Sequence, residues 1–307
     1  MSVLADLAAP SGRIFARTRY PVGAALFWAD YLFAGGGQFD FARPTLPSQK
    51  LKVLGRGVHG LVLEDGDRVI KVTTSELDRI FAVNEVLVLR ALQPLGLANF
   101  MTMHEVYQHA LPRDGGRSHA VVHPEPRGNF VHLVLPRLVG AQTLKQWAAL
   151  PSTSATELVQ VLTQVVLGLE MAFRAVEFSH NDLHAQNILV EPLPAPKRFS
   201  YRFDGKTLGV VSSWRAVIID FGHSACRGSL HTHVNHRQDL VHPIARVMLE
   251  PRWRRLGRSL LVPLVGVDHS RFLTGDAFRA WVEQDHCALA EGPADGVGVV
   301  EAWAKIA

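Results

Sequence analysis

The sequence predicts an α+β fold in which a small, strand-rich part precedes a larger, mainly helical part. Short apolar runs separated by glycine-rich turns between residues 51 and 72 are typical of antiparallel strands. Residues 83–92 carry apolar side chains at helical spacing, and the apolar anchors after residue 249 also fit helices. With 307 residues, 48% of them hydrophobic, the chain can bury the core of one two-lobed unit or of two small domains.

The first predicted element is a hairpin with a glycine-rich turn. Residues 55–62 read GRGVHGLV, matching the pattern G-x-G-x-x-G-x-V, and apolar residues flank the turn on both sides. Taken alone, the glycines indicate an ordinary turn, and a dinucleotide fingerprint is disfavoured because a strand follows, not a helix. In a phosphate-binding loop, glycines let the backbone fold closely over the phosphates. The glycines concerned are Gly55, Gly57 and Gly60, and the flanking residues are Leu51, Val53, Leu61 and Leu63.

A third strand and a helix follow the hairpin. The turn at residues 64–67 leads into RVIKV at residues 68–72, which places Lys71 on a strand where a cation can reach the α and β phosphates of a nucleotide. Lys71 needs a carboxylate partner. Glu85 is the better candidate because Leu89 and Leu92 share its helix face, four and seven residues on. Glu76 is the alternative, but we expect it in the connecting turn.

The most informative motif is HNDLHAQN at residues 180–187, followed 33 residues after Asn187 by DFG at residues 220–222. Asp182 has the place of a residue that orients a substrate hydroxyl and accepts its proton. Asn187 and Asp220 offer the oxygen ligands that Mg²⁺ prefers. Apolar runs at residues 188–190 and 216–219 place both ligands beside short buried strands. Together the motifs predict a phosphoryl-transfer centre.

Between residues 51 and 249 the chain resembles the eukaryotic-like protein kinase superfamily. Within it, the sequence is most similar to haspin-like kinases and to the Ser/Thr kinases of large DNA viruses. Residues 164–173 and 178–190 resemble the long helix and catalytic loop of those proteins. Residues 201–206 resemble an insertion before the DFG strand, where ordinary protein kinases have a short hairpin.

The resemblance implies a bilobal protein-kinase-like fold, with a five-stranded antiparallel sheet in the N-lobe and a mainly helical C-lobe. It implies an N-terminal extension at residues 1–50 packing on the N-lobe, an N-lobe at residues 51–138 and a C-lobe at residues 139–307. Val62 and Val69 are expected above the adenine and Leu189 below it. The hinge is expected at residues 135–138, where main-chain groups face the adenine. Its residues include Leu135 as gatekeeper, Pro136, which lacks a backbone donor, and Leu138.

The resemblance also implies an internal spine of Leu89, His180 and Phe221, and it has notable departures. Asn181 replaces the arginine that usually precedes the catalytic aspartate, so no cation is expected there to pair with a loop phosphate. No APE sequence follows residue 222, and residues 223–238 are too short for the usual peptide-docking platform. Asp239 resembles the buried aspartate that anchors the catalytic loop; an ordinary helix N-cap is the alternative.

Composition limits the partners that we expect. Lys and Arg exceed Asp and Glu by 32 to 28 and the pI is about 9.3, a mild excess that gives little support for nucleic acid. Cys226 and Cys287 form no disulfide framework and indicate a reducing compartment. No apolar run of transmembrane length or secretory signal is evident, so we expect no membrane insertion and an intracellular, cytoplasmic protein, or a host-cell or virion protein if viral.

Two histidine patterns invite a metal interpretation. His231, His233 and His236 fall in a six-residue window, but no Cys or carboxylate arrangement completes a zinc site. His180 and His184 have the i, i+4 spacing of a metalloprotease, but the intervening residues do not match H-E-x-x-H. Both patterns are therefore interpreted without a metal.

The predicted function is an ATP-dependent protein kinase that uses Mg²⁺ or Mn²⁺ and transfers the γ-phosphate to Ser or Thr hydroxyls of a protein substrate. A small-molecule phosphotransferase of the aminoglycoside type is an alternative because it shares the H-x-D-x-x-x-x-N loop. The glycine-rich loop and literal DFG favour a protein acceptor. A catalytically inert kinase-like binding module is a third possibility, although competent residues fill the catalytic positions.

Overall fold

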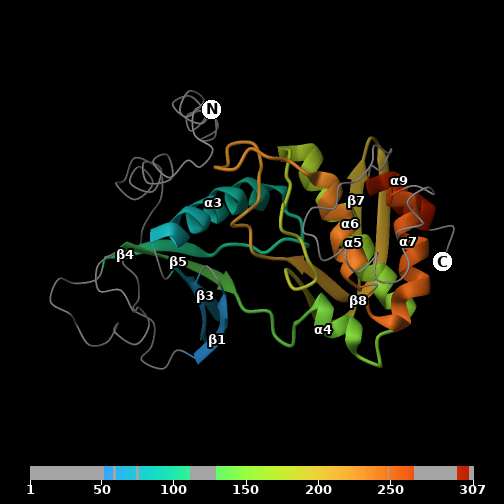
Figure 1. The fold of residues 1–307 in the computed structure, drawn as a ribbon, viewed down its shortest axis with the longest axis horizontal. Coiled ribbons are helices and arrows are strands. Elements are labelled where there is room, and N and C mark those ends of the chain that lie inside the picture. The colour runs from blue at the N-terminus through green and yellow to red at the C-terminus, as the bar shows by residue number, and fades with distance from the viewer. Residues whose placement is uncertain are drawn as a thin grey trace.

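The structure is a computed structural model that describes residues 52–57, 60–73, 76–110, 129–247, 249–265 and 296–303. The N-terminal extension at residues 1–50, expected to pack on the N-lobe, lies outside the described residues, as do Leu51 and Cys287. A five-stranded sheet with one long helix lies toward one end of the molecule, and most of the other helices gather toward the opposite end (Figure 1).

The predicted five-stranded antiparallel sheet is confirmed. Its strand order is β1-β2-β3-β5-β4, and each neighbouring pair is antiparallel. Alternate apolar residues of β2, β3 and β5 form one buried cluster, as expected for strands with one face against a core. The strands are β1 Lys52–Gly57, β2 Gly60–Asp65, β3 Arg68–Val72, β4 Glu105–Ala110 and β5 Asn129–Pro136.

Helix α3, Glu76–Leu92, packs against β5 of this sheet. The predicted helix at residues 83–92 is therefore confirmed, but it begins earlier than expected. Glu76, expected in the connecting turn, is the first residue of the helix. An acidic residue is favourable at this end, because the helix dipole places partial positive charge there.

Helix α5, Ala155–Val176, is the central helix of the second part (Figure 1). Ser154 and Glu157 form a capping box at its start, and it ends at Glu177, which has a left-handed conformation with φ of 57°. By length and composition, α5 is also long and apolar enough to span a membrane, although the apolar runs of the sequence predict no such helix. In the structure 61% of the relevant window is buried inside the protein, the behaviour of a core helix.

Four further helices and two short 3₁₀ turns complete the described helical structure. Helices α6 and α7 pack against each other, and α9 packs on α5 and α7. The bounds are α4 Leu144–Ala149, α6 His236–Val247, α7 Arg254–Val265, α9 Gly296–Trp303, η2 Gln93–Leu95 and η3 Pro251–Trp253.

A long hairpin corrects the expectation of short strands around the motifs. Strand β7 runs over Ile188–Phe203 and β8 over Lys206–Ile218. In a three-stranded antiparallel sheet, β7 pairs with β8 on one side and with β6, Gln142–Thr143, on the other. The apparent insertion at residues 201–206 forms the end of this hairpin. Aromatic residues at this end pack with Leu167 of α5. Their burial stabilises β7 and β8 well beyond the short apolar runs next to the two motifs. These residues are Phe199, Tyr201 and Phe203.

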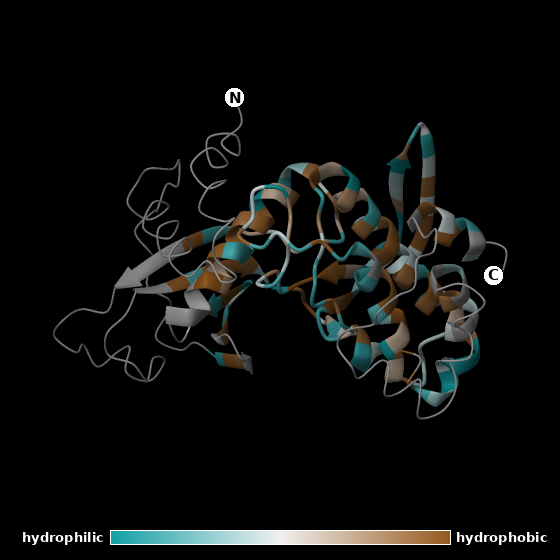
Figure 2. Cartoon of the chain, turned by 45° about the horizontal axis from the view of Figure 1, so that its top comes forward, coloured by the Kyte–Doolittle hydropathy of each residue, from teal (hydrophilic) through white to brown (hydrophobic). Residues whose placement is uncertain are grey.

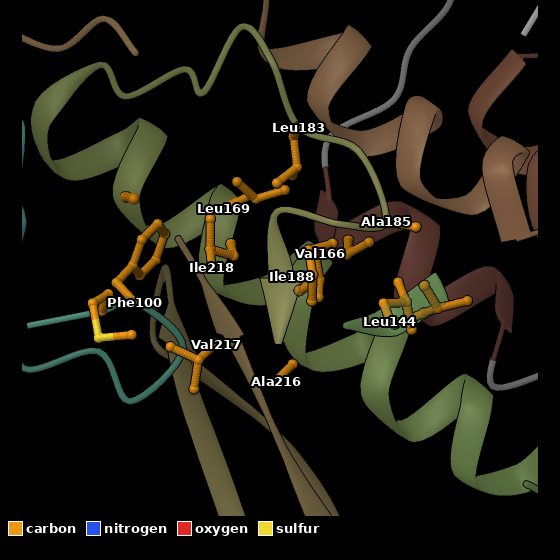
Figure 3. Close-up of a cluster of buried hydrophobic side chains, with 14 of the residues drawn as sticks. Phe100, Leu144, Val166, Leu169, Leu183, Ala185, Ile188, Ala216, Val217 and Ile218 are labelled. Atoms are coloured by element: carbon orange, nitrogen blue, oxygen red, sulfur yellow. The ribbon is translucent and has the colours of Figure 1, made fainter. Parts of the chain in front are cut away.

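The largest of the described buried clusters joins the loop at residues 182–187 to α5 and to the inner ends of β7 and β8. Figure 3 shows Leu183 directed toward Leu169, with Ile188 beside Val166 and Ile218 close by. Strand segments in the middle of the molecule are coloured hydrophobic in Figure 2, in agreement with their burial. Because this core is continuous with the loop at residues 182–187, packing fixes the loop backbone.

Candidate active site

Lys71 joins two parts of the predicted site. Its Nζ lies 2.7 Å from Oε2 of Glu85 and 2.6 Å from Oδ1 of Asp220. Lys71 comes from β3, Glu85 from α3, and Asp220 from the segment directly after β8. Of the two candidate partners of Lys71, the structure therefore brings Glu85 to it, whereas the side chain of Glu76 lies outside the described residues.

Charge and burial oppose each other in this cluster. Burial alone would lower the pKa of Lys71, but the carboxylates of Glu85 and Asp220 outweigh it and raise that pKa above its ordinary range. Burial raises the pKa of Glu85, and Lys71 counteracts this by favouring the carboxylate. The backbone N–H of Phe221 also donates to Glu85 Oε1 at 3.3 Å. The geometry thus holds Lys71 as a cation at the junction of sheet, helix and DFG segment.

The loop with Asp182 and Asn187 alternates apolar anchors with polar residues. Leu183 and Ala185 are buried in the main core (Figure 3), while Asp182 and His184 stay partly exposed. The amide nitrogen of Asn187 donates to the carbonyl oxygen of Asp182 at 2.9 Å. This contact closes the loop and leaves Asn187 Oδ1 as the atom suited to a cation.

Asp239 anchors the backbone of the same loop. Its carboxylate accepts from the N–H of His180 at 2.6 Å, the N–H of Asn181 at 3.0 Å and the hydroxyl of Ser179 at 2.8 Å. Burial raises the pKa of Asp239, while these donors favour the charged form. The N-cap alternative is wrong, because Asn235 precedes α6 and accepts from the N–H of Gln238.

The predicted spine lies in the same buried region. The rings of His180 and Phe221 have centroids 5.5 Å apart, and His180 Nε2 lies 2.9 Å from the carbonyl oxygen of Ile219. Leu89 and Phe221 belong to one buried cluster. Leu89, His180 and Phe221 are thus all fully buried, and His180 contacts the DFG segment through the ring of Phe221.

Asn84 was not recognised from the sequence, yet it ties α3 to the segment after DFG. Its amide nitrogen donates to the carbonyl oxygens of Phe221, Gly222 and Ser224 at 3.3, 3.0 and 2.8 Å. Its Oδ1 accepts from the N–H of Leu230 at 2.9 Å. A fully buried amide in the middle of an apolar helix was the signal that could have revealed it.

Asn181 forms a second tie to this segment. Its amide nitrogen donates to the carbonyl oxygens of His223 at 3.1 Å and His233 at 2.8 Å, and its Oδ1 accepts from the hydroxyl of Ser179 at 2.8 Å. The backbone of Asn181 has φ of 63°, a left-handed conformation that asparagine tolerates better than most residues. Asn181, which stands where an arginine was expected, therefore contacts the segment after DFG directly.

We expect Asn84→Ala to lower turnover. Asn84 holds the residues that follow Asp220, so its loss should let Asp220 move relative to Glu85. The change leaves three buried carbonyls and one N–H without this partner, which should cost about 2–3 kcal/mol of unfolding free energy. Asn99→Ala is the matched control, because Asn99 is another buried amide that bonds Ala216 and Tyr201 instead. Thermal unfolding and rates per folded protein separate the effects. Wild-type rates in Asn84→Ala would contradict a positioning role.

The glycine hairpin has the expected layout. Gly57 and Gly60 are cross-strand partners, and residues 58–59 between them lie outside the described residues. Gly60 has φ of 152°, and a Cβ there would lie 2.1 Å from the carbonyl oxygen of Val72. A side chain at this position would therefore clash with backbone. Gly55 has open space around it and lies at a register shift in β1.

The predicted adenine-facing residues lie on three strands. Val62 is opposite Lys71 in the sheet, Val69 is opposite Leu135, and Leu189 lies on β7 beside Val217. Val62, Val69 and Leu189 are each partly exposed, whereas Leu135 is buried.

The structure limits which main-chain groups of the expected hinge are free to bind a ligand. Pro136 ends β5, and the N–H of Arg137 donates to the carbonyl oxygen of Asp67 at 2.9 Å. Of the expected hinge residues after Leu135, Pro136 thus has no N–H and the N–H of Arg137 is already bonded within the protein.

The histidines after DFG show no metal site. Within the described residues, no cluster of three His, Cys, Asp or Glu side chains has metal-binding geometry. His223 and His231 instead stack with ring centroids 6.4 Å apart, and Phe81 lies 4.7 Å from His223. Cys226 is free and buried, and burial raises the pKa of its thiol to about 11. That pKa disfavours the thiolate, so the thiol is unsuited to nucleophilic chemistry.

Comparison with known proteins supports a kinase-like chain. No family model matches the sequence. A probable kinase (098L) of Invertebrate iridescent virus 3 is 33% identical over 109 residues, which cover 34% of this chain and 20% of the viral protein. An uncharacterized protein (ZK177.2) of Caenorhabditis elegans is 27% identical over 223 residues, covering 68% of this chain and 66% of that protein. The chain thus spans a fifth and just under two thirds of these relatives, and its similarity is to a probable kinase, without a more specific family.

Proposed function

We propose that this chain is an ATP-dependent protein kinase that transfers the γ-phosphate to Ser or Thr hydroxyls. The observation that carries the proposal is the pairing of Lys71 with both Glu85 and Asp220, which lie 14 and 149 residues away. Lys71, which is held by the two carboxylates, lies on the strand that pairs with the glycine-rich hairpin. A cation in this place suits the α and β phosphates of a nucleotide. The similarity to a probable kinase supports the same reaction class.

The proposed roles follow from the chemistry of each side chain. Lys71 orients the nucleotide phosphates, and Glu85 positions Lys71. The oxygen of the acceptor hydroxyl attacks the γ-phosphorus, and the bond from the γ-phosphorus to the bridging oxygen of the β-phosphate breaks. Asp182 accepts the proton that the hydroxyl loses. The glycines of the hairpin bring backbone N–H groups close to the phosphates. We propose Val62, Val69, Leu135, Leu189 and the main chain at Pro136 and Leu138 as the adenine contacts.

The donor set fits a magnesium or manganese ion. Asn187 and Asp220 provide one amide and one carboxylate oxygen, and the amide nitrogen of Asn187 is already used by Asp182. A bound divalent ion would neutralise phosphate charge during transfer. In this proposal Asn187 and Asp220 hold the ion, while Lys71 keeps Asp220 oriented until it binds.

The proposal is tested by one panel of acceptors. Purified protein is incubated with labelled ATP and Mg²⁺, and generic protein acceptors are compared with aminoglycosides. We expect label on Ser or Thr of the proteins, located by mass spectrometry. Label on aminoglycosides alone would replace the proposal with a small-molecule phosphotransferase, and nucleotide binding without transfer would indicate an inert binding module.

We propose further that residues 51–138 and 139–307 are the two lobes of this kinase and that it acts inside a cell. Separate expression of the second segment tests the boundary. A soluble, cooperatively unfolding product, alone or co-expressed with residues 51–138, would support the boundary, and aggregation under both conditions would place it elsewhere.

We expect activity to be independent of phosphorylation in the segment after DFG. Ser224 and Ser229 are buried, and their hydroxyls donate to the carbonyl oxygens of His180 and Cys226. Thr232 is exposed, but Asn181, which contacts the adjacent residue His233, carries no charge to pair with a phosphate.

The measurement compares initial rates before and after phosphatase treatment, with mass spectrometry showing Ser224, Ser229 and Thr232 unmodified. Thr232→Ala is the cleanest variant, because the hydroxyls of the two serines have structural partners. A loss of tenfold or more on dephosphorylation, about 1.4 kcal/mol in barrier height, would show that loop phosphorylation controls the enzyme.

A further inference from the structure

A second feature lies beside the catalytic loop, a cavity of about 180 Å³. Three of its residues, His184, Ala185 and Gln186, separate Asp182 from Asn187 in the sequence. Gln186 and Lys145 are exposed, so the cavity reaches the protein surface. An occupant would therefore contact the loop that carries Asp182 and Asn187, the residues that the proposed function assigns to the transfer. The other lining residues are Ala148, Arg246, Val247, Leu249 and Glu250.

Hydrogen bonds hold the walls of this cavity in place. The N–H of Lys145, on α4, donates to the carbonyl oxygen of Ala185 at 3.1 Å. On α6, His242 Nδ1 lies 3.0 Å from the carbonyl oxygen of Leu183, and Arg246 Nε donates to His242 Nε2 at 3.2 Å. His242 thus bridges the catalytic loop and Arg246. The cavity is thus built from the loop and from two helices, α4 and α6, that are each hydrogen-bonded to it.

Most polar groups of the lining are hydrogen-bond donors. Lys145 and Arg246 are cations, and Glu250 is the one carboxylate in the lining. The N–H of Gln186 donates to His184 Nδ1 at 3.2 Å, so a neutral His184 carries its proton on Nε2 and is a donor there. An anionic group satisfies these donors, while Glu250 suits an N–H or hydroxyl of the same occupant.

We propose that this cavity is an acceptor subsite that selects protein segments with an anionic side chain, carboxylate or phosphate, close to the phosphorylated hydroxyl. The proposal rests on the proposed kinase function and names its substrate class. The location carries it, because the acceptor hydroxyl must reach Asp182 and the residues two to four positions after Asp182 line the cavity. The small volume fits one side chain of an extended segment and excludes a folded domain.

The test uses serine peptides that are identical except for one flanking residue: glutamate, phosphoserine, glutamine or lysine, placed in turn on either side of the serine. We expect kcat/KM to be about threefold to tenfold higher for the anionic peptides than for glutamine, as for partly exposed charge pairs. Lysine should lower it. A larger effect for phosphoserine than for glutamate would identify phosphate as the preferred group.

Lys145→Glu should remove or reverse the preference for anionic peptides. Because Lys145 is exposed on α4, we expect the variant to fold normally. Lys197→Glu is the matched control, because Lys197 is an exposed lysine on β7 outside the cavity. The control should keep the wild-type preference. Equal kcat/KM for all peptides in an active enzyme would overturn the subsite and leave the kinase proposal intact.

A binding measurement separates the two proposals. A fluorescent glutamate peptide with alanine in place of the serine is titrated against wild type and both lysine variants. We expect weaker binding only in Lys145→Glu. If no peptide is phosphorylated, the proposed function fails, and equal binding by all three proteins would also overturn the anionic subsite.

Discussion

Asp220→Ala is expected to reduce phosphoryl transfer by about 10³-fold or more, equivalent to about 4 kcal/mol in barrier height. The change removes a proposed ligand of the divalent ion and one of the two carboxylates that hold Lys71. Without that ion, phosphate charge repels the attacking hydroxyl. The fold should survive because the Asp220 side chain is 41% exposed.

The backbone of Asp220 requires a second variant. Its φ is 67°, a left-handed conformation that alanine adopts less readily than aspartate. Asp220→Asn keeps a side chain that tolerates this conformation and removes only the charge. We expect nearly the same loss of rate, while Asp204→Ala, which removes a distant exposed carboxylate, should retain activity. Wild-type turnover in a folded Asp220→Asn protein would refute the metal assignment.

Lys71→Ala and Glu85→Ala should impair the same step, each by about 10²-fold to 10³-fold, and the double variant should be little worse than the more damaged single one. Glu85 acts by orienting Lys71, so its contribution disappears once the lysine is gone. Initial rates of the four proteins of this double-mutant cycle measure the coupling.

Stability must be followed in the same cycle. Lys71→Ala leaves the buried carboxylate of Glu85 without its cation, which should cost about 3–5 kcal/mol. Glu85→Gln is the control, since it keeps an acceptor for the N–H of Phe221. If the double variant lost activity as the full product of the single losses, the functional partner of Lys71 would be sought elsewhere, first at Glu76.

The sequence predicts the residues of the site better than it predicts what holds them. Lys71, Asp182 and Asp220 each belong to a motif whose residues are close in sequence, so local spacing reveals them. Asn84 contacts residues 137 to 146 positions away. No local pattern specifies such partners, because chain folding alone brings them together.

The same limit applies to the fold. Alternating apolar residues specify β2 and β3, and the structure agrees. The same pattern does not predict the long hairpin of β7 and β8. Three prolines near the middle of β7 argue against a continuous strand: Pro192, Pro194 and Pro196. The register shifts between Pro192 and Lys197 and then resumes. Packing of the distant hairpin end on α5 outweighs the local signal.

The two amide ties of the segment after DFG have a consequence for how such an enzyme responds to its surroundings. Asn84 and Asn181 hold the segment through neutral groups bonded to backbone carbonyls. A phosphate paired with arginine weakens as salt rises, since charges are screened over about 8 Å at physiological ionic strength. Neutral amides bonded to carbonyls escape this screening. Under the proposed function, the position of this segment would therefore depend neither on ionic strength nor on phosphorylation by an upstream signalling cascade.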